Sequence, residues 1–329
     1  MTSALVHTWR LLTWGRTLAR HGALRGIERD PNTPARLRRL LRLARFGARV
    51  PEQPRYADAF EALGPAAIKL GQTLATRPDI VGEDAANGLL RLQDAVPPIP
   101  FSVVCAQMKA SFGRPLDQLF SEIEEVPVGA ASIAQVHRAL TTDGRRVAVK
   151  VLRPNVEEDF ARAIDTYEWA AAQIEPMGGE LARLQPRLVI ETFKRWTARE
   201  LDLRREAASS SELAENMSAE PGFLVPAIDW QRTTGKVLTS EWIDGIKLSN
   251  RAALISAGYD LPGLARVLIH AFLRQAIADG FFHADMHQGN LRVAPNGDIV
   301  AFDFGIMGEI DEYTRRTYAE IILGFIQRD

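Results

Sequence analysis

The sequence predicts an α+β protein in which short strands joined by tight turns interrupt a mainly helical chain. The runs 133–140 and 146–151 are rich in β-branched residues, and the Asp143–Gly144 pair between them is a strong hairpin signal. A second hairpin is predicted where Asn296–Gly297 separates two apolar runs. Because these strands follow one another without an intervening helix, an alternating βαβ arrangement is excluded.

The composition is that of an ordinary globular chain of 329 residues, long enough for two domains or one large bilobal domain. With 46% hydrophobic and 25% charged residues, the chain is neither disordered nor collagen-like. The formal net charge of −1 disfavours a globally basic nucleic-acid-binding protein, so no nucleic acid is expected as a partner. Cys105 is the only cysteine, which excludes an internal disulfide and a cysteine-based zinc site.

Positive charge is concentrated at the N-terminus. Residues 1–50 hold eleven arginines and two acidic residues, a net charge of +9, whereas the other 29 basic and 39 acidic residues give −10. Within 5–21, apolar residues at helical spacing alternate with arginines: Leu5, Trp9, Leu12 and Leu18, with Arg10, Arg16 and Arg20. The segment fits a helix at an anionic membrane surface and, equally, a surface helix packed on its own domain. It is also similar to a mitochondrial-type targeting sequence, and no apolar window is long enough for a transmembrane helix.

The other elements are predicted from the same patterns. A basic helix at 34–50 ends at Pro51, and the proline-rich stretch 96–100 is a linker. Helices are predicted at 56–94 with a break at Pro78, then at 102–112, 156–175, 186–217, 248–256 and 261–279, and strands at 223–230 and 236–243.

The most specific chemical signal is HADMHQGN at 283–290 followed by AFDFG at 301–305. Phosphoryl transfer needs such a set, because one carboxylate orients or deprotonates the acceptor while an amide oxygen and a second carboxylate hold Mg²⁺ on the nucleotide phosphates. The spacing matches the protein-kinase pattern of Asp, four residues, Asn, and then Asp-Phe-Gly after a hairpin. We therefore predict Asp285 as catalytic base or water-orienting group, and Asn290 and Asp303 as magnesium ligands.

A second interpretation of the same stretch is a zinc hydrolase site. His283 and His287 are four residues apart with Asp285 between them, a spacing that suits metal ligands on one helix face. The Gly-Asn that follows favours a loop over a ligand-bearing helix, and no third histidine is near. The phosphoryl-transfer interpretation is therefore preferred.

Three further segments fit a nucleotide site, although each alone is also explained by an ordinary strand or turn. Lys150 ends the run VAVK, from which its amine reaches the α- and β-phosphates if a carboxylate orients it. A strand ending in Glu-Trp-Ile is similar to a hinge whose backbone at Glu241 and Ile243 bonds adenine. Before Lys150, a small-residue stretch takes the place of a phosphate-covering loop, with alanines that predict a stiffer loop and altered phosphate geometry. Its predicted ATP contacts are Val128, Gly129, Ala130, Ala131, Ser132, Ile133, Ala134, Gln135 and Val136.

From about residue 56 to the end, these motifs together resemble the UbiB/AarF family of atypical protein-kinase-like proteins, which is linked to ubiquinone biosynthesis. The stretch AAIKLGQTLATRPDI is similar to the family's K-x-G-Q motif, with Lys69 and Gln72. The stretch ELDLRREA is similar to its E-x-D motif, with Glu200 and Asp202. Taken alone, the first pair also fits a solvated helix face, and the second fits local pairing with neighbouring arginines.

The resemblance implies a bilobal protein-kinase-like fold with a helical N-terminal extension that restricts substrate entry and a C-lobe that is incomplete at Asp329. It implies Glu206 as the ion-pair partner of Lys150, and ATP and Mg²⁺ as cofactors. The implied domains are a basic amphipathic segment at 1–50, an extension at 51–122, an N-lobe with a helical insertion at 123–245 and a partial C-lobe at 246–329.

The implied function is that of an atypical kinase or ATPase that supports ubiquinone synthesis. The implied location is peripheral, on the cytoplasmic side of a bacterial inner membrane or on the mitochondrial inner membrane, with anionic lipid, ubiquinone-biosynthesis enzymes or lipid precursors as partners. Two alternatives stay open: a small-molecule phosphotransferase of the aminoglycoside-kinase type, and a non-catalytic nucleotide-binding regulator. Three residues depart from the family pattern: Gln288, where proline is common, and Leu203 and Ser209 near the E-x-D motif.

Overall fold

The computed structural model describes residues 4–29, 33, 35–47, 50–93, 97–177, 183 and 185–327. Parts of the segments predicted at 1–50 and 96–100, and the last two residues of 246–329, lie outside these ranges. Contacts along the chain define two compact units. Unit 1 comprises residues 1–100, 129–135 and 152–201, and unit 2 comprises residues 101–128, 136–151 and 202–329.

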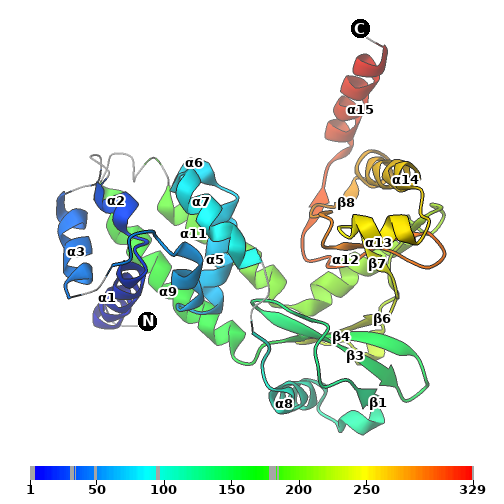
Figure 1. The fold of residues 1–329 in the computed structure, drawn as a ribbon, viewed down its shortest axis with the longest axis horizontal. Coiled ribbons are helices and arrows are strands. Elements are labelled where there is room, and N and C mark those ends of the chain that lie inside the picture. Colours follow the sequence, from blue (N-terminus) through cyan, green and yellow to red (C-terminus); the bar gives the residue numbers. More distant parts are fainter. Residues whose placement is uncertain are drawn as a thin grey trace. The chain divides into compact units, whose positions relative to one another are not determined.

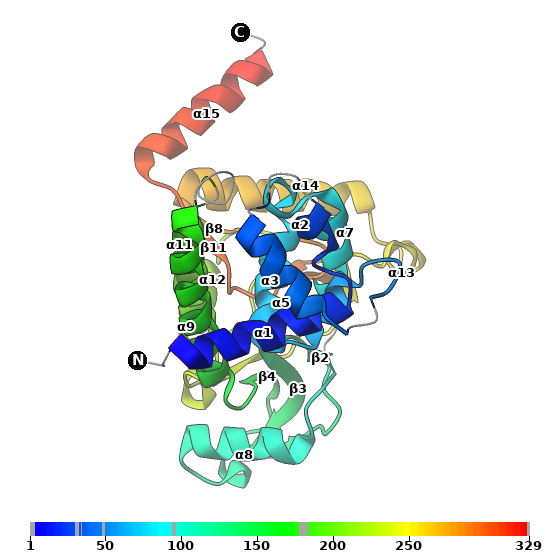
Figure 2. The ribbon, with the colours of Figure 1, turned by 90° about the vertical axis from the view of Figure 1, so that its left-hand side faces the viewer.

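Unit 1 is built of helices (Figure 1). Helices α9 and α11 lie side by side, and α1 and α3 lie against each other, as Figure 2 also shows. The bounds are α1 Ala4–Arg20, α2 Arg25–Arg29, α3 Ala35–Arg45, α4 Tyr56–Glu61, α5 Pro65–Ala75, α6 Pro78–Val81, α7 Glu83–Leu89, η1 Leu90–Gln93, α9 Val156–Ile174, η3 Glu175–Met177 and α11 Pro186–Glu200.

Helix α1 is anchored on its own unit through one face. The buried ring of His7 stacks on Trp169 with the centroids 5.6 Å apart, and its Nδ1 lies 3.3 Å from the Thr166 hydroxyl. A Cβ atom added to Gly15 would lie 3.4 Å from the Cβ of Ala44, so α1 and α3 approach closely there. The interpretation of 5–21 as a packed surface helix holds for this face. The other face exposes Leu5, Trp9 and Leu12.

Helix α5 packs closely against α4 and η1 at Gly71. A Cβ atom at this position would lie 2.5 Å from Leu92 Cδ1 and 2.8 Å from Phe60 Cδ1, well inside van der Waals contact. Glycine lowers intrinsic helix stability by roughly 0.5–1 kcal/mol relative to alanine. Its place inside α5 is therefore explained by the close approach of the neighbouring side chains.

Unit 2 contains most of a five-stranded sheet in the order β1-β3-β4-β6, with β2 paired to β3. The predicted turn joins β3 to β4, with Gly144 in the left-handed region at φ 82°. Val147, Val149 and Val151 are buried, so Lys150 stands on the opposite face of β4. The strands are β1 Phe120–Ile123, β2 Gly129–Ala130, β3 Ala134–Thr141, β4 Arg146–Leu152 and β6 Val237–Glu241.

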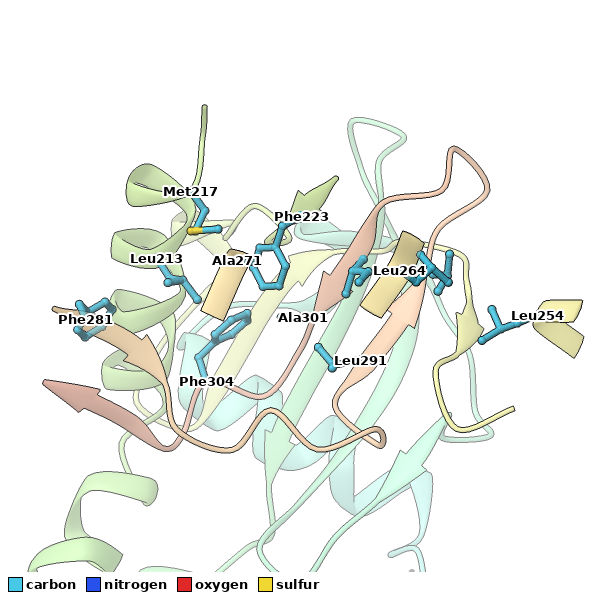
Figure 3. Packing of buried hydrophobic residues seen from close by; sticks show 12 residues of the cluster. Leu213, Met217, Phe223, Leu254, Leu264, Ala271, Phe281, Leu291, Ala301 and Phe304 are labelled. Atoms are coloured by element: carbon cyan, nitrogen blue, oxygen red, sulfur yellow. The ribbon is translucent and has the colours of Figure 1, made fainter. Parts of the chain in front are cut away.

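The helices and small sheets of unit 2 surround a hydrophobic cluster (Figure 3). Leu213 and Met217 of α12 meet Phe281, Leu291 and Phe304 in it. The two small sheets have the orders β5-β10-β9-β7 and β11-β8. The bounds are α8 Phe101–Phe112, η2 Leu116–Gln118, α12 Leu203–Asn216, β5 Phe223–Leu224, η4 Trp230–Arg232, β7 Ile246–Lys247, α13 Arg251–Ser256, α14 Leu261–Leu273, η5 Arg274–Asp279, β8 Phe281–His283, β9 Leu291–Val293, β10 Ile299–Ala301, β11 Met307–Glu309 and α15 Glu312–Gln327.

The predicted α+β class is confirmed, whereas several elements differ from their predictions. The helix predicted at 56–94 with one break at Pro78 is divided into α4, α5, α6, α7 and η1. The helix predicted at 186–217 is two helices, because Asp202 is extended and its carboxylate accepts the N–H of Arg204 as N-cap of α12. The strand predicted at 223–230 is only β5, since Pro226 has no N–H to donate to a ladder. The helix predicted at 261–279 turns into a π-helix at η5.

Candidate active site

The ammonium of Lys150 is the centre of a charge cluster in unit 2. Its Nζ lies 2.8 Å from both carboxylate oxygens of Glu206, on the first turn of α12. It also lies 3.2 Å from Oδ1 of Asp303, which follows β10. The side chains of Lys150 and Glu206 are 20% and 11% exposed. The structure thus brings together three predicted site residues that are far apart in the sequence.

Two opposing effects set the pKa of Lys150. Burial lowers the pKa of the ammonium, whereas the carboxylates of Asp303 and Glu206 raise it by a larger amount, so the net pKa lies above its ordinary value. The amine is therefore a fixed positive charge at neutral pH. A fixed cation of this kind suits the α- and β-phosphates of a nucleotide.

Asp303 has an unusual backbone. Its φ is 61°, in the left-handed region that non-glycine residues rarely occupy. Its side chain is 56% exposed, while the adjacent Phe304 is buried in the cluster of Figure 3. Strained residues of this kind persist where the surrounding structure enforces them, often at functional sites. Burial of the phenylalanine holds this segment in the hydrophobic cluster, and the aspartate carboxylate stays partly exposed beside Lys150.

Asp285 and Asn290 lie on one loop between β8 and β9. The side-chain amide of Asn290 donates to the backbone carbonyl of Asp285 at 3.1 Å and to its Oδ2 at 3.3 Å. The backbone carbonyl of Asn290 accepts the N–H of Phe302 at 2.9 Å, one residue before Asp303. The loop is thereby tied to the Asp-Phe-Gly segment. The amide oxygen of Asn290 is the atom left for a cation.

The zinc-site interpretation of His283 and His287 is wrong. The buried ring of His283 uses both nitrogens: Nδ1 accepts the N–H of Asp285 at 3.1 Å, so the proton is on Nε2, which donates to the carbonyl of Phe302 at 3.1 Å. No lone pair remains for a metal. The described part of the chain contains no group of three or more His, Cys, Asp or Glu side chains placed to hold a metal ion.

The donor set nevertheless fits Mg²⁺ held on a nucleotide. Asp303 and Asn290 supply hard oxygen atoms, which Mg²⁺ prefers. This ion is usually bound by one or two protein carboxylates together with phosphate oxygens and water, rather than by an all-protein cage. Two protein ligands beside a fixed lysine are therefore sufficient for a site that is completed by the phosphates.

The predicted phosphate-covering loop is divided between the units, with Gly129–Gln135 in unit 1. The N–H of Ala131 donates to the carbonyl of Ala134 at 2.8 Å, which closes a tight turn. Arg153 fastens this turn: its N–H donates to the carbonyl of Ile133 at 2.8 Å and its Nε to that of Ala131 at 3.0 Å.

The same loop is joined to the linker that precedes α8. Arg153 Nη2 donates to the carbonyl of Pro97 at 2.8 Å. Gln135 is fully buried, and its Oε1 accepts the N–H of Ile99 at 2.9 Å. No sequence pattern predicts these contacts, because Arg153 lies outside every predicted motif. These hydrogen bonds tie the loop to its neighbours, and the stiffness predicted from its alanines stays a prediction.

The predicted hinge lies at the end of β6. Glu241 is paired with Val147 of β4 in the sheet register, and its N–H donates to the carbonyl of Ala227 at 2.8 Å. Trp242, the next residue, donates its N–H to the carbonyl of Arg146 at 3.0 Å. The carbonyl of Glu241 and the N–H of Ile243 remain the groups that the predicted adenine contacts require.

One residue of the K-x-G-Q motif pairs with one residue of the E-x-D motif within unit 1. Lys69 Nζ lies 2.7 Å from Oε1 of Glu200, and both side chains are largely buried. Gln72 Nε2 donates to the carbonyl of Leu92 at 2.7 Å. The solvated-face interpretation of this pair is therefore wrong. For Asp202 the local interpretation holds, because the guanidinium of Arg204 donates to it and holds the pKa of its carboxyl below the usual value.

Comparisons with known proteins found one matching family model and similar solved structures. A family model described as the ABC1 atypical kinase-like domain matches residues 91–329. The chain is similar to Rv3197 of Mycobacterium tuberculosis, whose structure is a complex with erythromycin, at 31% identity over 77% of this chain with a TM-score of 0.51. The match spans 63% of that relative's length. A weaker similarity, to the apo form of PpkA-294, has 17% identity and a TM-score of 0.32, and covers 55% of this chain and 57% of that one.

Proposed function

The chain belongs to the ABC1 atypical kinase-like family, and from this premise we propose that it binds Mg-ATP in unit 2 and transfers the γ-phosphoryl group to a hydroxyl or to water. The observation that carries the proposal is the position of the Lys150 ammonium between the carboxylates of Glu206 and Asp303, at 2.8 and 3.2 Å. Glu206 holds the Lys150 amine from the buried side, and Asp303 contacts it from the exposed side. The amine is therefore oriented even without a phosphate.

Each residue has one role in this mechanism. Lys150 would bind the α- and β-phosphates, and Asp303 and Asn290 would hold Mg²⁺, which would supply positive charge against the charge that develops on the phosphates. Asp285 orients the acceptor oxygen and takes its proton as that oxygen bonds to the γ-phosphorus. The bond from the γ-phosphorus to the bridging oxygen breaks, and ADP leaves with the electron pair of that bond.

Removal of the metal tests the proposal. ATP binding to the intact chain is expected to saturate with Mg²⁺ and to weaken by about tenfold or more in EDTA or in Asp303→Asn. Asp298→Asn, in the β9–β10 turn, is the control and should match the wild type. Titration of a fluorescent ATP analogue measures all four conditions. Equal affinity in the presence and absence of Mg²⁺ would exclude this site as a magnesium-nucleotide site.

We further propose that the activity supports ubiquinone biosynthesis, with enzymes or lipid precursors of that synthesis as partners. The ion pair of Lys69 with Glu200 and the bond from Gln72 to Leu92 support this assignment, because they give the motifs of the UbiB/AarF resemblance a structural role. Turnover without added acceptor distinguishes an ATPase from a phosphotransferase, and binding without turnover identifies a non-catalytic regulator.

A lipid surface is the proposed partner of the N-terminal helices. Leu5, Trp9 and Leu12 form an exposed stripe on α1. On α3 the exposed side chains alternate between basic and apolar residues, namely Arg39, Leu40, Arg42, Leu43 and Arg45, and the exposed Phe46 follows the helix. The net charge of +9 over residues 1–50 complements an anionic headgroup layer. Within the described residues, no helix combines the length and hydrophobicity needed to cross a bilayer. Peripheral binding through this face, on the cytoplasmic side of the membrane, is what we propose.

Vesicle flotation tests this face. The double variant Trp9→Gln, Leu12→Gln is expected to reduce binding to phosphatidylglycerol vesicles by about tenfold or more. The reason is that two apolar side chains that would be buried in the lipid on binding are lost. Thr8→Gln with Thr13→Gln changes exposed positions outside the stripe and should bind as the wild type does. Binding should weaken with salt and on neutral vesicles. If the stripe variant floats as well as the control variant, the face is not a membrane surface.

A further inference from the structure

The helix that leads into β8 ends in a π-helix, and this irregular turn buries a polar side chain. Helix α14 becomes η5 at Arg274, and Gln275 is fully buried there. π-Helical turns are rare and are frequent at functional sites. A buried glutamine in an otherwise apolar environment is costly unless its polar atoms are bonded. Its partner therefore indicates its role.

The partner of Gln275 is the backbone of β8. In the two-stranded sheet β8–β11, Ala284 donates its N–H to the carbonyl of Ile306 at 3.1 Å. Backbone groups of successive strand residues point in opposite directions, so the N–H of His283 points away from β11. Oε1 of Gln275 accepts this N–H at 3.0 Å. The glutamine side chain thus takes the place of a third strand at the open edge of β8.

His283, which donates this hydrogen bond, is also the residue whose ring joins the two catalytic segments. His283 accepts the N–H of Asp285 through Nδ1 and donates to the carbonyl of Phe302 through Nε2. Its ring also lies 5.4 Å from that of Phe304. A displacement of the His283 backbone would therefore move Asp285 and the residue before Asp303 together.

We propose that Gln275 is a positioning residue that sets the place of Asp285 through the backbone of His283. The proposal rests on the proposed function, because Asp285 is the group it positions. Gln275 touches neither Asp285 nor Asp303 in any hydrogen bond of the described residues. Its Nε2 is buried without a hydrogen-bond partner among them, so the acceptor Oε1 is the atom that does the positioning.

The variants are chosen to remove or keep the accepting Oε1 of Gln275, because Nε2 makes no hydrogen bond among the described residues. Gln275→Met keeps an unbranched side chain of similar volume and removes the strong acceptor. Gln275→Glu keeps a carboxyl oxygen in the acceptor position. Leu264→Ala, in the hydrophobic cluster of Figure 3, serves as the control for a loss of stability without a change at β8.

Two measurements on the intact chain decide the question. Gln275→Met is expected to accelerate amide hydrogen exchange at His283 by about tenfold or more. It is also expected to lower kcat for ATP turnover by roughly 10- to 100-fold, with KM for Mg-ATP within about twofold. Gln275→Glu should restore most of the exchange protection and of kcat. Leu264→Ala should change neither the His283 amide relative to its neighbours nor kcat at a temperature where it is folded.

Three outcomes would overturn the proposal. The first is an unchanged rate of hydrogen exchange at the His283 amide in Gln275→Met. The second is faster exchange at this amide in a variant whose kcat equals that of an active wild type. The third is a fall in kcat that Leu264→Ala reproduces. If the wild type itself fails to turn over ATP, the proposed function fails, whereas the His283 exchange still reports whether Gln275 holds β8. The two failures are therefore distinguishable.

Discussion

Asp285→Asn is expected to lower ATP turnover by about 10²- to 10⁴-fold while leaving the Kd for Mg-ATP within about twofold. The side chain of Asp285 is 43% exposed, and its Oδ2 already accepts a hydrogen bond from Asn290. Asparagine preserves the shape of the side chain but accepts no proton from the attacking oxygen. Turnover and binding are therefore expected to separate in this variant, which the loss of a phosphate contact would not produce.

Two measurements complete the Asp285 experiment. Steady-state ATPase assays give kcat, and titration of a fluorescent nucleotide gives Kd in the same buffer. Asp298→Asn makes the same chemical change at an aspartate of the β9–β10 turn and should leave both quantities unchanged. Wild-type turnover in Asp285→Asn would remove this residue from the mechanism, and an equal loss of turnover and binding would assign it to nucleotide binding.

Lys150→Met is expected to have the largest effect on both binding and stability. Removal of the ammonium deprives the phosphates of their fixed cation, so Mg-ATP affinity should fall by about tenfold or more. It also leaves the largely buried Glu206 without its partner. Breaking a buried pair in this way destabilises a protein by about 3–5 kcal/mol, and the partial exposure of Lys150 reduces the expected value to roughly 2–4 kcal/mol.

The double variant Lys150→Met, Glu206→Gln separates the two effects. It also removes the negative charge of Glu206, so the free energy of unfolding measured with denaturant should recover most of the stability that Lys150→Met loses. Mg-ATP affinity should stay low, because the cation is still missing. Recovery of affinity along with stability would show that Lys150 acts on folding and has no contact with the nucleotide.

The raised pKa of Lys150 fixes the pH range in which this experiment is valid. A group whose pKa is higher in the folded than in the unfolded chain contributes its stability fully below the unfolded value, and loses it as the pH rises through the folded value. The unfolded value is about 10.5. Titration of the Lys150 ammonium is therefore expected to leave the stability difference between the wild type and Lys150→Met constant from about pH 6 to pH 9.

Local signals in the sequence were sufficient for the hairpins, and they also carry the prediction of the site's chemistry. Gly144 and Gly297 have φ values of 82° and 94°, as tight turns at their positions require. The alternation of buried residues around Lys150 follows from a period of two along β4. The spacing of Asp285, Asn290 and Asp303 predicts a phosphoryl-transfer set, because these residues are close in the sequence and joined by one hairpin.

These local patterns do not predict contacts between segments that are distant in the sequence. The apolar spacing of 186–217 continues through residue 202, so the break appears only when Asp202 is seen to cap α12. The pairing of Glu206 with Lys150 came from the family resemblance, since a distance of 56 residues carries no periodic signal. Nor does the sequence reveal that Arg153 fastens the alanine-rich loop or that Gln275 bonds the edge of β8.

Local sequence patterns were enough to predict the fold class and the two tight turns, and they indicate which groups would handle phosphate and magnesium. The carboxylates that hold the lysine, the Nε2 proton of His283 and the buried amide that bonds the backbone beside Asp285 become visible in the folded chain. This difference arises because turn conformation and strand alternation depend on neighbouring residues. Hydrogen-bond partners and burial depend on segments that folding alone brings together.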